Sequence, residues 1–209
     1  MTIEPGKAWG RAVPRPPDLE IVHGDAELAA AISLRRERPI AVASGDLART
    51  IGVGQGGGGS IATRQTINEF PVDLLEVHLD DARDPIIACA HVIAREPWYR
   101  AHWLRGRILV VMNAEFIGEW DIAPRGHPND GRAEVVEVES SMSLRDRLAA
   151  RRRLPTGAHV PHPHIATRSI RTGTWTFERP LEVLADGRRI GAASTLSVKV
   201  IADAALVHA

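Results

Sequence analysis

The last two thirds of this 209-residue chain contain seven runs rich in valine, isoleucine, leucine and threonine, and these runs constrain the fold most strongly. Several alternate apolar and polar residues, as AEVVEVE at 133–139 does, and turn residues separate most of them. A period of two is typical of strands with one buried face. The runs are VDLLEVHL, DPIIACAHVIA, GRILVVMNAEFIG, AEVVEVES, IATRSIRTGTWTF, PLEVLAD and TLSVKVIA. They predict an antiparallel sandwich or barrel from about Phe70 onward, interrupted by one helix that Ser143 caps and that ends before Pro155.

A different pattern precedes these runs, in residues 19–52. There LEIV and PIAVA read as short strands, and each is followed by a glycine-containing turn and a helix, AELAAAISLRRE and LARTIGV. Strands that alternate with helices are the signature of a parallel sheet. The expected fold class is therefore α+β: a β-rich, antiparallel, sandwich-like domain with a small remnant α/β (βαβα) unit packed against it.

Four segments follow from these patterns. Residues 1–18 are rich in proline and lack apolar periodicity, so we expect an extended arm. Residues 19–52 form the α/β unit and residues 70–209 the β-rich domain. Between them, residues 53–69 read as a glycine-rich linker. The stretch GVGQGGGGS favours a flexible loop over a phosphate-binding one, because a phosphate-binding loop usually also carries a lysine or a serine or threonine at a fixed place at its helical end.

Charge and cysteine content narrow the class of protein. Twenty-six basic and 26 acidic residues give no net charge, whereas nucleic-acid-binding proteins normally carry a basic excess, so we expect no nucleic acid partner. No uncharged apolar run approaches the ~18 residues of a membrane-spanning helix, and the first residues lack the hydrophobic core of a signal peptide. The single Cys89 excludes an internal disulfide and fits a reducing compartment, so we expect a cytoplasmic protein.

Two strand–turn–helix segments of the α/β unit carry the first candidate site residues. AVASGDLARTIGV is similar to the pattern P-x-GTGND-x-AR-x-LG from Ser44 to Gly52, although the Asn before the Asp is missing and the turn is one residue shorter. IVHGDAELAAAI is similar to GGDGT-x-x-E at its Gly-Asp pair. With these motifs the sequence resembles the diacylglycerol kinase and YegS-like lipid kinase family, whose fold is related to that of NAD kinases. The resemblance implies a nucleotide-binding site formed by Gly24, Asp25, Ser44, Gly45, Asp46 and Arg49.

The segment IVHGDAELAAAI departs from the family pattern in its loop. His23 replaces its first glycine, and Ala26 and Glu27 replace the Gly-Thr pair. Close approach of backbone N–H groups to a phosphate needs glycine. The Glu27 carboxylate would also repel a phosphate at the start of the helix. These substitutions count against ATP binding in the manner of the family.

Two later turns complete the resemblance. IAPRGHPNDGRAEVVEV is similar to the family turn P-x-A-x-x-DDGLLDVV, which implies that Asp130 helps to hold a structural magnesium ion; taken alone, Asn-Asp-Gly is an ordinary hairpin turn. PLEVLADGRRIG is similar to the closing v-x-v-DGE segment, whose aspartate is the general base toward the lipid hydroxyl. Asp186 is the matching residue, and a carboxylate can accept that proton. Arg132 stands where the family has an apolar residue, and Arg188 stands where it has a glutamate, so both turns carry an added positive charge.

If the last strands return to pair with the α/β unit, the cleft between the two parts should hold Asp25, Asp46 and Asp186. The resemblance implies transfer of the γ-phosphoryl group of ATP to a lipid hydroxyl, with ATP and magnesium as cofactors. The altered motifs, and the missing strand–helix units before residue 19, predict that this activity is weakened or lost. The alternative is a non-catalytic lipid- or protein-binding module, without a cofactor, that keeps the kinase fold.

Three other segments stay open between function and packing. EPWYRAHWLRGR interleaves aromatic residues with arginines, which suits a lipid or membrane surface and equally suits a core with a basic outer face. Peripheral membrane association and a homo-oligomer are therefore alternatives that the sequence leaves open. The arginines at 151–153 are favourable at a helix C-terminus without any partner. His159, His162 and His164 have a spacing that zinc can use, but a stiff, proline-containing strand entry is the plainer interpretation.

Overall fold

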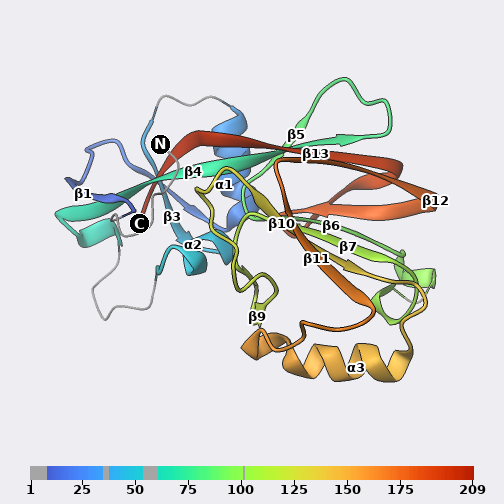
Figure 1. The fold of residues 1–209 in the computed structure, drawn as a ribbon. Helices are drawn as coiled ribbons and strands as arrows, with labels where there is room; N and C mark the ends of the chain where they lie inside the picture. Colours follow the sequence, from blue (N-terminus) through green and yellow to red (C-terminus); the bar gives the residue numbers. More distant parts are fainter. Residues whose placement is uncertain (1–8, 35–37, 54–60, 101) are drawn as a thin grey trace.

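The computed structural model describes residues 9–34, 38–53, 61–100 and 102–209. Within these ranges an 11-stranded sheet dominates the molecule, accompanied by a two-stranded ribbon and three α-helices (Figure 1). The strands are β1 (Arg11–Pro14), β2 (Glu20–His23), β3 (Ile40–Ser44), β4 (Thr66–Leu79), β5 (Ile86–Ala88), β6 (His91–Arg95), β7 (Ile108–Met112), β8 (Phe116–Ile117), β9 (Trp120–Asp121), β10 (Ala133–Val138), β11 (Ile165–Ile170), β12 (Thr172–Ala185) and β13 (Arg188–His208). The helices are α1 (Asp25–Ser33), α2 (Asp46–Thr50) and α3 (Leu144–Arg153), with 3-10 turns η1 (Ile61–Thr63), η2 (Trp98–Arg100), η3 (His102–Leu104) and η4 (Leu154–Thr156). The α+β, β-rich fold class is confirmed.

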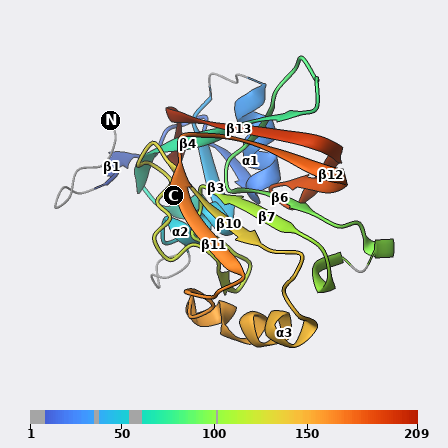
Figure 2. The same cartoon turned by 45° about the vertical axis from the view of Figure 1, so that its right-hand side comes forward.

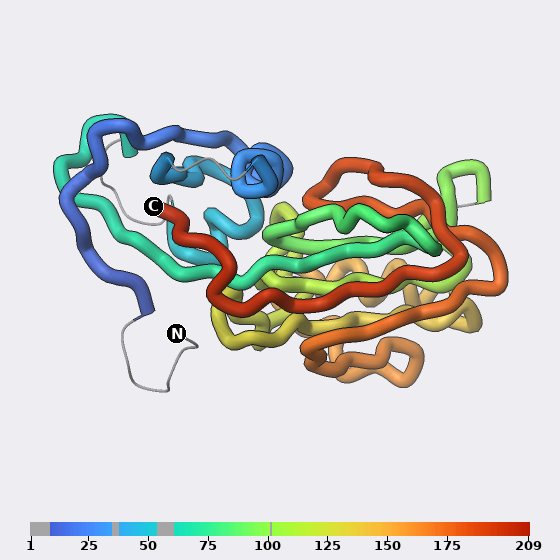
Figure 3. Tube along the Cα trace, turned by 90° about the horizontal axis from the view of Figure 1, so that it is seen from above, coloured from blue at the N-terminus to red at the C-terminus, as the bar shows by residue number. Residues whose placement is uncertain are grey.

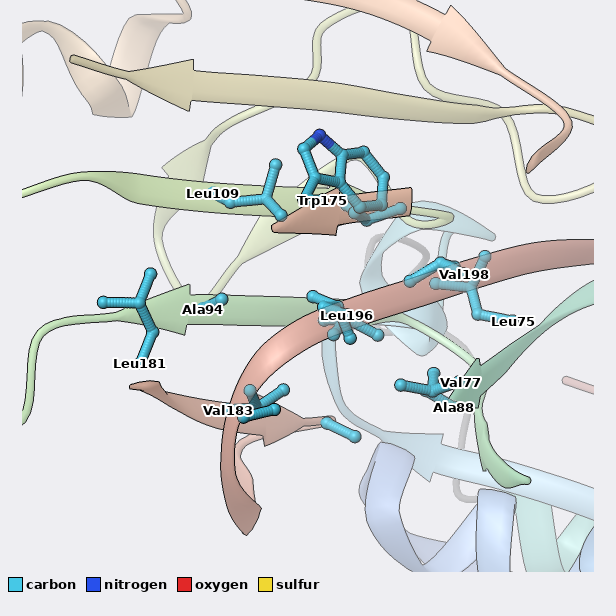
Figure 4. Close-up of a cluster of buried hydrophobic side chains, with 14 of the residues drawn as sticks. Leu75, Val77, Ala88, Ala94, Leu109, Trp175, Leu181, Val183, Leu196 and Val198 are labelled. Atoms are coloured by element: carbon cyan, nitrogen blue, oxygen red, sulfur yellow. The ribbon is translucent and has the colours of Figure 1, made fainter. Parts of the chain in front are cut away.

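The β-rich part is one continuous sheet that curls around a shared core. Its strands follow the order β4-β13-β12-β6-β7-β10-β11, and every pair along this path is antiparallel. The pairing of β12 with β13 is interrupted between Thr176 and Leu181, where the register shifts. Inward-facing side chains from β4, β6, β7, β12 and β13 meet in this core, as Figure 4 shows for Leu75, Leu109, Trp175 and Leu196. The sandwich-like appearance therefore comes from one folded sheet.

The βαβα unit forms as the sequence predicts, and it is joined to the same sheet. β2 and β3 pair in parallel, and β3 pairs in parallel with the last residues of β13, where Val207 lies opposite Ile40. β4 and β13 are long enough to run from the β-rich part into the small unit (Figure 3). A second core lies under α1 and α2 and includes Leu28, Leu47 and Val207. The two parts therefore share the strands β4 and β13.

The expected arm and linker contain regular structure. Residues 11–14 form β1, which pairs with β4 from Arg11 opposite Glu69 to Pro14 opposite Thr66. β4 itself begins at Thr66, inside the segment expected to be a linker. Residues 54–60 of the glycine-rich stretch lie outside the described residues.

The helix α3 packs across the outer face of the sheet on the side formed by β6, β7, β10 and β11 (Figures 1 and 2). The Ser143 side chain accepts a hydrogen bond from the Asp146 amide, so the predicted N-cap is confirmed. The buried Arg147 guanidinium donates to the carbonyls of Met142, Trp103, Gly106 and Glu139, which fixes the helix to two neighbouring loops. No helix in the described ranges is long and apolar enough to cross a membrane.

Candidate functional site between the two halves

The two aspartates of the α/β unit lie side by side because their strands are parallel neighbours. Asp25 and Asp46 open α1 and α2 directly after β2 and β3, and the carboxyl ends of parallel strands meet at one edge of a sheet. The Asp25 carboxylate accepts the amides of Asp46 at 2.6 Å and Leu47 at 3.0 Å, so it joins the two helices. A Cβ at Gly45 would lie 2.6 Å from an Asp25 oxygen, and Gly45 has φ 119°, so only glycine fits there.

Asp186 reaches the same region from the β12–β13 turn. Its backbone has φ 49°, and its carboxylate accepts three amides, those of Cys89 and Ala90 at 2.8 Å and of His91 at 3.0 Å. The Cys89 thiol in turn donates to the Asp25 carbonyl at 3.2 Å. The general base implied by the resemblance is therefore buried and holds the connection between β5 and β6.

Asp46 connects this region to the β8–β9 ribbon. One of its carboxylate oxygens accepts the Gly118 amide at 2.6 Å, and the other lies 3.4 Å from Nδ1 of the buried His91. The Arg49 guanidinium donates to the Gly118 carbonyl and lies 4.2 Å from the centre of the Phe116 ring. Asp46 and Arg49 therefore bind the amide and the carbonyl of the same residue, Gly118, in the turn between β8 and β9.

The carboxylates influence one another electrostatically. Burial raises the pKa of Asp25 to about 6, against the two backbone amides that lower it, and the Asp186 and Asp46 carboxylates raise it further. Burial lowers the pKa of His91, while Asp186 and Asp46 oppose that shift. Burial and the Asp186 and Asp25 carboxylates raise the pKa of the Cys89 thiol. Cys89 is therefore a protonated, buried side chain and not a nucleophile.

Most of the residues expected at a nucleotide site are brought together. Asp25, Asp46, Arg49 and Asp186 take part in one network, and the Gly24 amide donates to the Ser44 carbonyl between the two turns. The Glu27 carboxylate accepts the His23 amide at 2.7 Å in the loop before α1. Both loops therefore have backbone amides that already donate to carboxylates of this chain.

Asp130 lies in a different place, in the turn before β10. Its carboxylate accepts the Arg132 amide at 2.9 Å, two residues along the same turn. The fully buried Asp73 accepts the Gly131 and Asp203 amides at 2.6 and 2.8 Å and fixes this turn to β13. Within the described ranges no group of three or more histidine, cysteine, aspartate or glutamate residues is arranged to hold a metal ion.

Three buried residues that take part in these networks belong to no motif of the sequence. His91 and Asp73 are buried, and the buried Asn113 donates to the Asp73 and Cys89 carbonyls, both at 2.8 Å. Asn113 thus links the turn at Asp130 to the network at Asp186. The sequence holds one local signal, for Asp73, which lies within the apolar run VDLLEV. A carboxylate in such a run is buried and therefore needs hydrogen-bond donors.

A separate apolar cavity of about 360 Å³ lies between the sheet and α3. Such a volume lies within the range of small-molecule sites, which are mostly apolar with few polar groups. Its wall on the sheet side includes Ile93, Val110, Ile122, Val136 and Ile165. Ala150, Arg151 and Leu154 close it from α3 and η4. The sequence offered no signal for this cavity, because the helix and the sheet that enclose it are far apart along the chain.

The three histidines after α3 do not form one site. His159 is buried and faces this cavity, and neither of its ring nitrogens has a hydrogen-bond partner among the described residues. Burial lowers the pKa of His159, and the charge of the Asp121 carboxylate opposes that shift. His164 instead lies 2.9 Å from the Glu139 carboxylate, and its ring centre is 5.9 Å from that of His162.

Comparisons with solved structures identify the class of fold. Three crystal structures from Bacillus anthracis str. Sterne, assigned as diacylglycerol kinases, superpose with TM-scores of 0.66, 0.64 and 0.61. The alignments cover 91% of this chain and 75 to 77% of those chains, with 14 to 15% sequence identity. No family model matches the sequence, and no curated protein matches it. The chain therefore has a diacylglycerol-kinase-like fold, which agrees with the resemblance seen in its motifs.

The raised pKa of Asp25 gives a direct test of this buried network. An ordinary aspartate titrates near 3.9, so Asp25 holds a proton in the folded state between about pH 4 and its own pKa of about 6. Its stabilising contribution is therefore present below about pH 4 and is lost as the pH rises through about 6. A ¹³C NMR titration of the carboxyl group should give a midpoint near 6, and Asp46→Asn should lower that midpoint by removing a neighbouring negative charge. A wild-type midpoint near 4 would contradict the described burial.

Proposed function

We propose that this protein is a lipid-binding relative of the diacylglycerol kinases in which phosphoryl transfer is weakened or lost. The observation that carries the proposal is the apolar cavity of about 360 Å³ beneath α3. Burial of hydrocarbon there would contribute roughly 0.8 kcal/mol per methylene group. The expected ligand is a lipid whose acyl chain enters this cavity, a class of ligand consistent with the lipid-kinase-like fold.

The chemistry of Asp186 supports the loss of transfer. In the family reaction this aspartate would accept the proton of the lipid hydroxyl as the oxygen attacks the γ-phosphorus of ATP. Here both carboxylate oxygens already accept backbone amides, and the residue is 9% exposed. Taking up a proton as a base would remove the negative charge to which these amides donate, and it would weaken the hold of Asp186 on the β5–β6 connection.

The residues around the turns do not fit magnesium ATP. The first two amides of α2 donate to Asp25, and the Glu27 carboxylate adds negative charge in the loop before α1. At the turn after β12, Arg188 stands where the family has an acidic residue. At Asp130, the carboxylate that the resemblance assigns to magnesium accepts the Arg132 amide and lies within the influence of the Arg132 charge. These contacts favour a binding protein over a phosphotransferase.

An active ATP- and magnesium-dependent lipid kinase is the second candidate. One observation favours it: Asp25, Asp46 and Asp186 lie in a single network between the two halves, where the resemblance places nucleotide and acceptor. In that case the amides now held by carboxylates would have to be released when the nucleotide binds. The two candidates differ in what magnesium ATP does to the protein.

Lipid binding is tested by filling the cavity. Ala150 faces it from α3, whereas the adjacent Ala149 is exposed. We expect Ala150→Phe to abolish binding of a fluorescent fatty acid, because the ring occupies the volume of the acyl chain, and we expect Ala149→Phe to bind as the wild type does. Val110→Phe fills the cavity from the sheet side and serves where Ala150→Phe fails to fold by circular dichroism. Equal affinity in all variants, or no binding by the wild type, would contradict the proposal.

Thermal unfolding with magnesium ATP tests the loss of nucleotide binding. A ligand present at 100 times its dissociation constant stabilises the folded state by about 2.7 kcal/mol. We expect no rise in melting temperature at millimolar magnesium ATP and no transfer of labelled phosphate to mixed-lipid vesicles. A rise accompanied by transfer would establish the kinase as the correct candidate.

A further inference from the structure

His159 places a polar ring in the wall of the apolar cavity beneath α3. The residue follows η4 in the segment that leads to β11, and only 3% of it is exposed. Among the described residues, neither Nδ1 nor Nε2 of this ring has a hydrogen-bond partner. Buried polar groups normally have a partner, because the loss of their contact with water is otherwise uncompensated. The imidazole is therefore a group that a polar atom of a ligand in the cavity can satisfy.

The His159 ring is uncharged and lies near a carboxylate. Burial lowers its pKa more than the charge of Asp121 raises it, so the ring is neutral at neutral pH. A neutral imidazole has one N–H donor and one acceptor nitrogen. Asp121 is close to the same segment, since a Cβ at Gly157 would lie 2.7 Å from one of its carboxylate oxygens. This part of the cavity wall therefore combines a neutral ring with a nearby negative charge.

The arginines that line the cavity already have partners. Arg147 donates to four backbone carbonyls, and Arg151 lies 4.7 and 5.4 Å from the centres of two tryptophan rings. Arg95 lies 3.6 Å from a carboxylate oxygen of Glu182. An anionic group of a ligand would therefore compete with partners that these cations already have, whereas an uncharged polar group would leave those contacts unchanged.

We infer that His159 recognises an uncharged hydroxyl group on a long-chain ligand bound in the cavity. A hydroxyl can donate or accept, so it complements whichever ring nitrogen faces the ligand. A carboxylate only accepts and would be repelled by Asp121, and an ammonium group only donates. The inference rests on the lipid binding proposed above and adds the chemistry of the polar group. The described lining of the cavity does not include Asp186, so this hydroxyl is not the phosphoryl acceptor of the family reaction.

Displacement of the fluorescent fatty acid from the full chain by dodecyl compounds tests this recognition. Dodecanol, dodecyl chloride, dodecylamine and dodecanoic acid share one chain and differ in the polar group. We expect His159→Leu to weaken dodecanol binding about tenfold, the value of one hydrogen bond, and to leave dodecyl chloride binding unchanged. His159→Gln keeps an uncharged donor and acceptor and should restore dodecanol binding to near the wild-type affinity. His164→Leu, outside the cavity lining, should bind every compound as the wild type does.

A second readout uses the wild-type protein and needs no variant. Dodecanol should move one ¹⁵N resonance of the His159 ring much further than dodecyl chloride does, because only the alcohol can hydrogen-bond to that nitrogen. If the wild type binds no dodecyl compound, the proposed lipid binding fails together with the inference. Binding that His159→Leu leaves unchanged, with equal ring shifts for both compounds, overturns the inference alone. A larger loss for dodecylamine or dodecanoic acid than for dodecanol also overturns it, since the ring would then recognise a charged group.

Discussion

The carboxylate of Asp186 holds together the segments on which the junction of the two halves depends. It lies in the turn between β12 and β13 and accepts the amides of Cys89, Ala90 and His91, where β5 passes into β6. From there the Cys89 thiol reaches Asp25, and Asp25 holds the start of α2. A single buried chain of contacts thus connects a hairpin of the β-rich half to both helices of the small unit. Buried carboxylates of this kind are stable only when their oxygens are hydrogen-bonded.

This network gives Asp25, Asp46 and Asp186 structural roles that do not depend on a substrate. An aspartate that satisfies several buried amides stabilises the fold whether or not it meets a substrate. The departures at Glu27 and Arg188 are then tolerable, because neither disturbs those hydrogen bonds. Positions that look catalytic in a sequence can therefore be retained for structural reasons alone.

Local signals in the sequence were sufficient for much of the fold. The β2-α1-β3-α2 order, the strand-rich second half and the Ser143 N-cap all follow from periodicity and capping within a few residues. The parallel pairing of β13 with β3 joins residues more than 160 positions apart, at Val207 and Ile40. No local pattern predicts this pairing, and the cleft between the two parts was expected only if the last strands formed it. Asp73, His91 and Asn113 could not be assigned roles, since their partners come from distant strands and loops. The cavity was missed for the same reason.

The helix α3 forms one wall of the apolar cavity. Its inner face closes the apolar cavity with Ala150, and its outer face exposes Leu144 and Leu148. Arg147 fixes the helix through four backbone carbonyls, so both faces are held in place by one buried side chain. The inner face of α3 therefore belongs to the cavity, whereas the network at Asp186 is formed by other elements.

Urea unfolding of Asp186→Asn tests the structural role of this residue most directly. The account predicts a loss of about 3 kcal/mol in the free energy of unfolding, because an asparagine cannot satisfy three buried amides that donated to a carboxylate. Asp81→Asn, at an exposed position between β4 and β5, should change it by less than about 0.5 kcal/mol. Unchanged or increased stability in Asp186→Asn would contradict the account, since it would show that the carboxylate is kept for chemistry and not for folding.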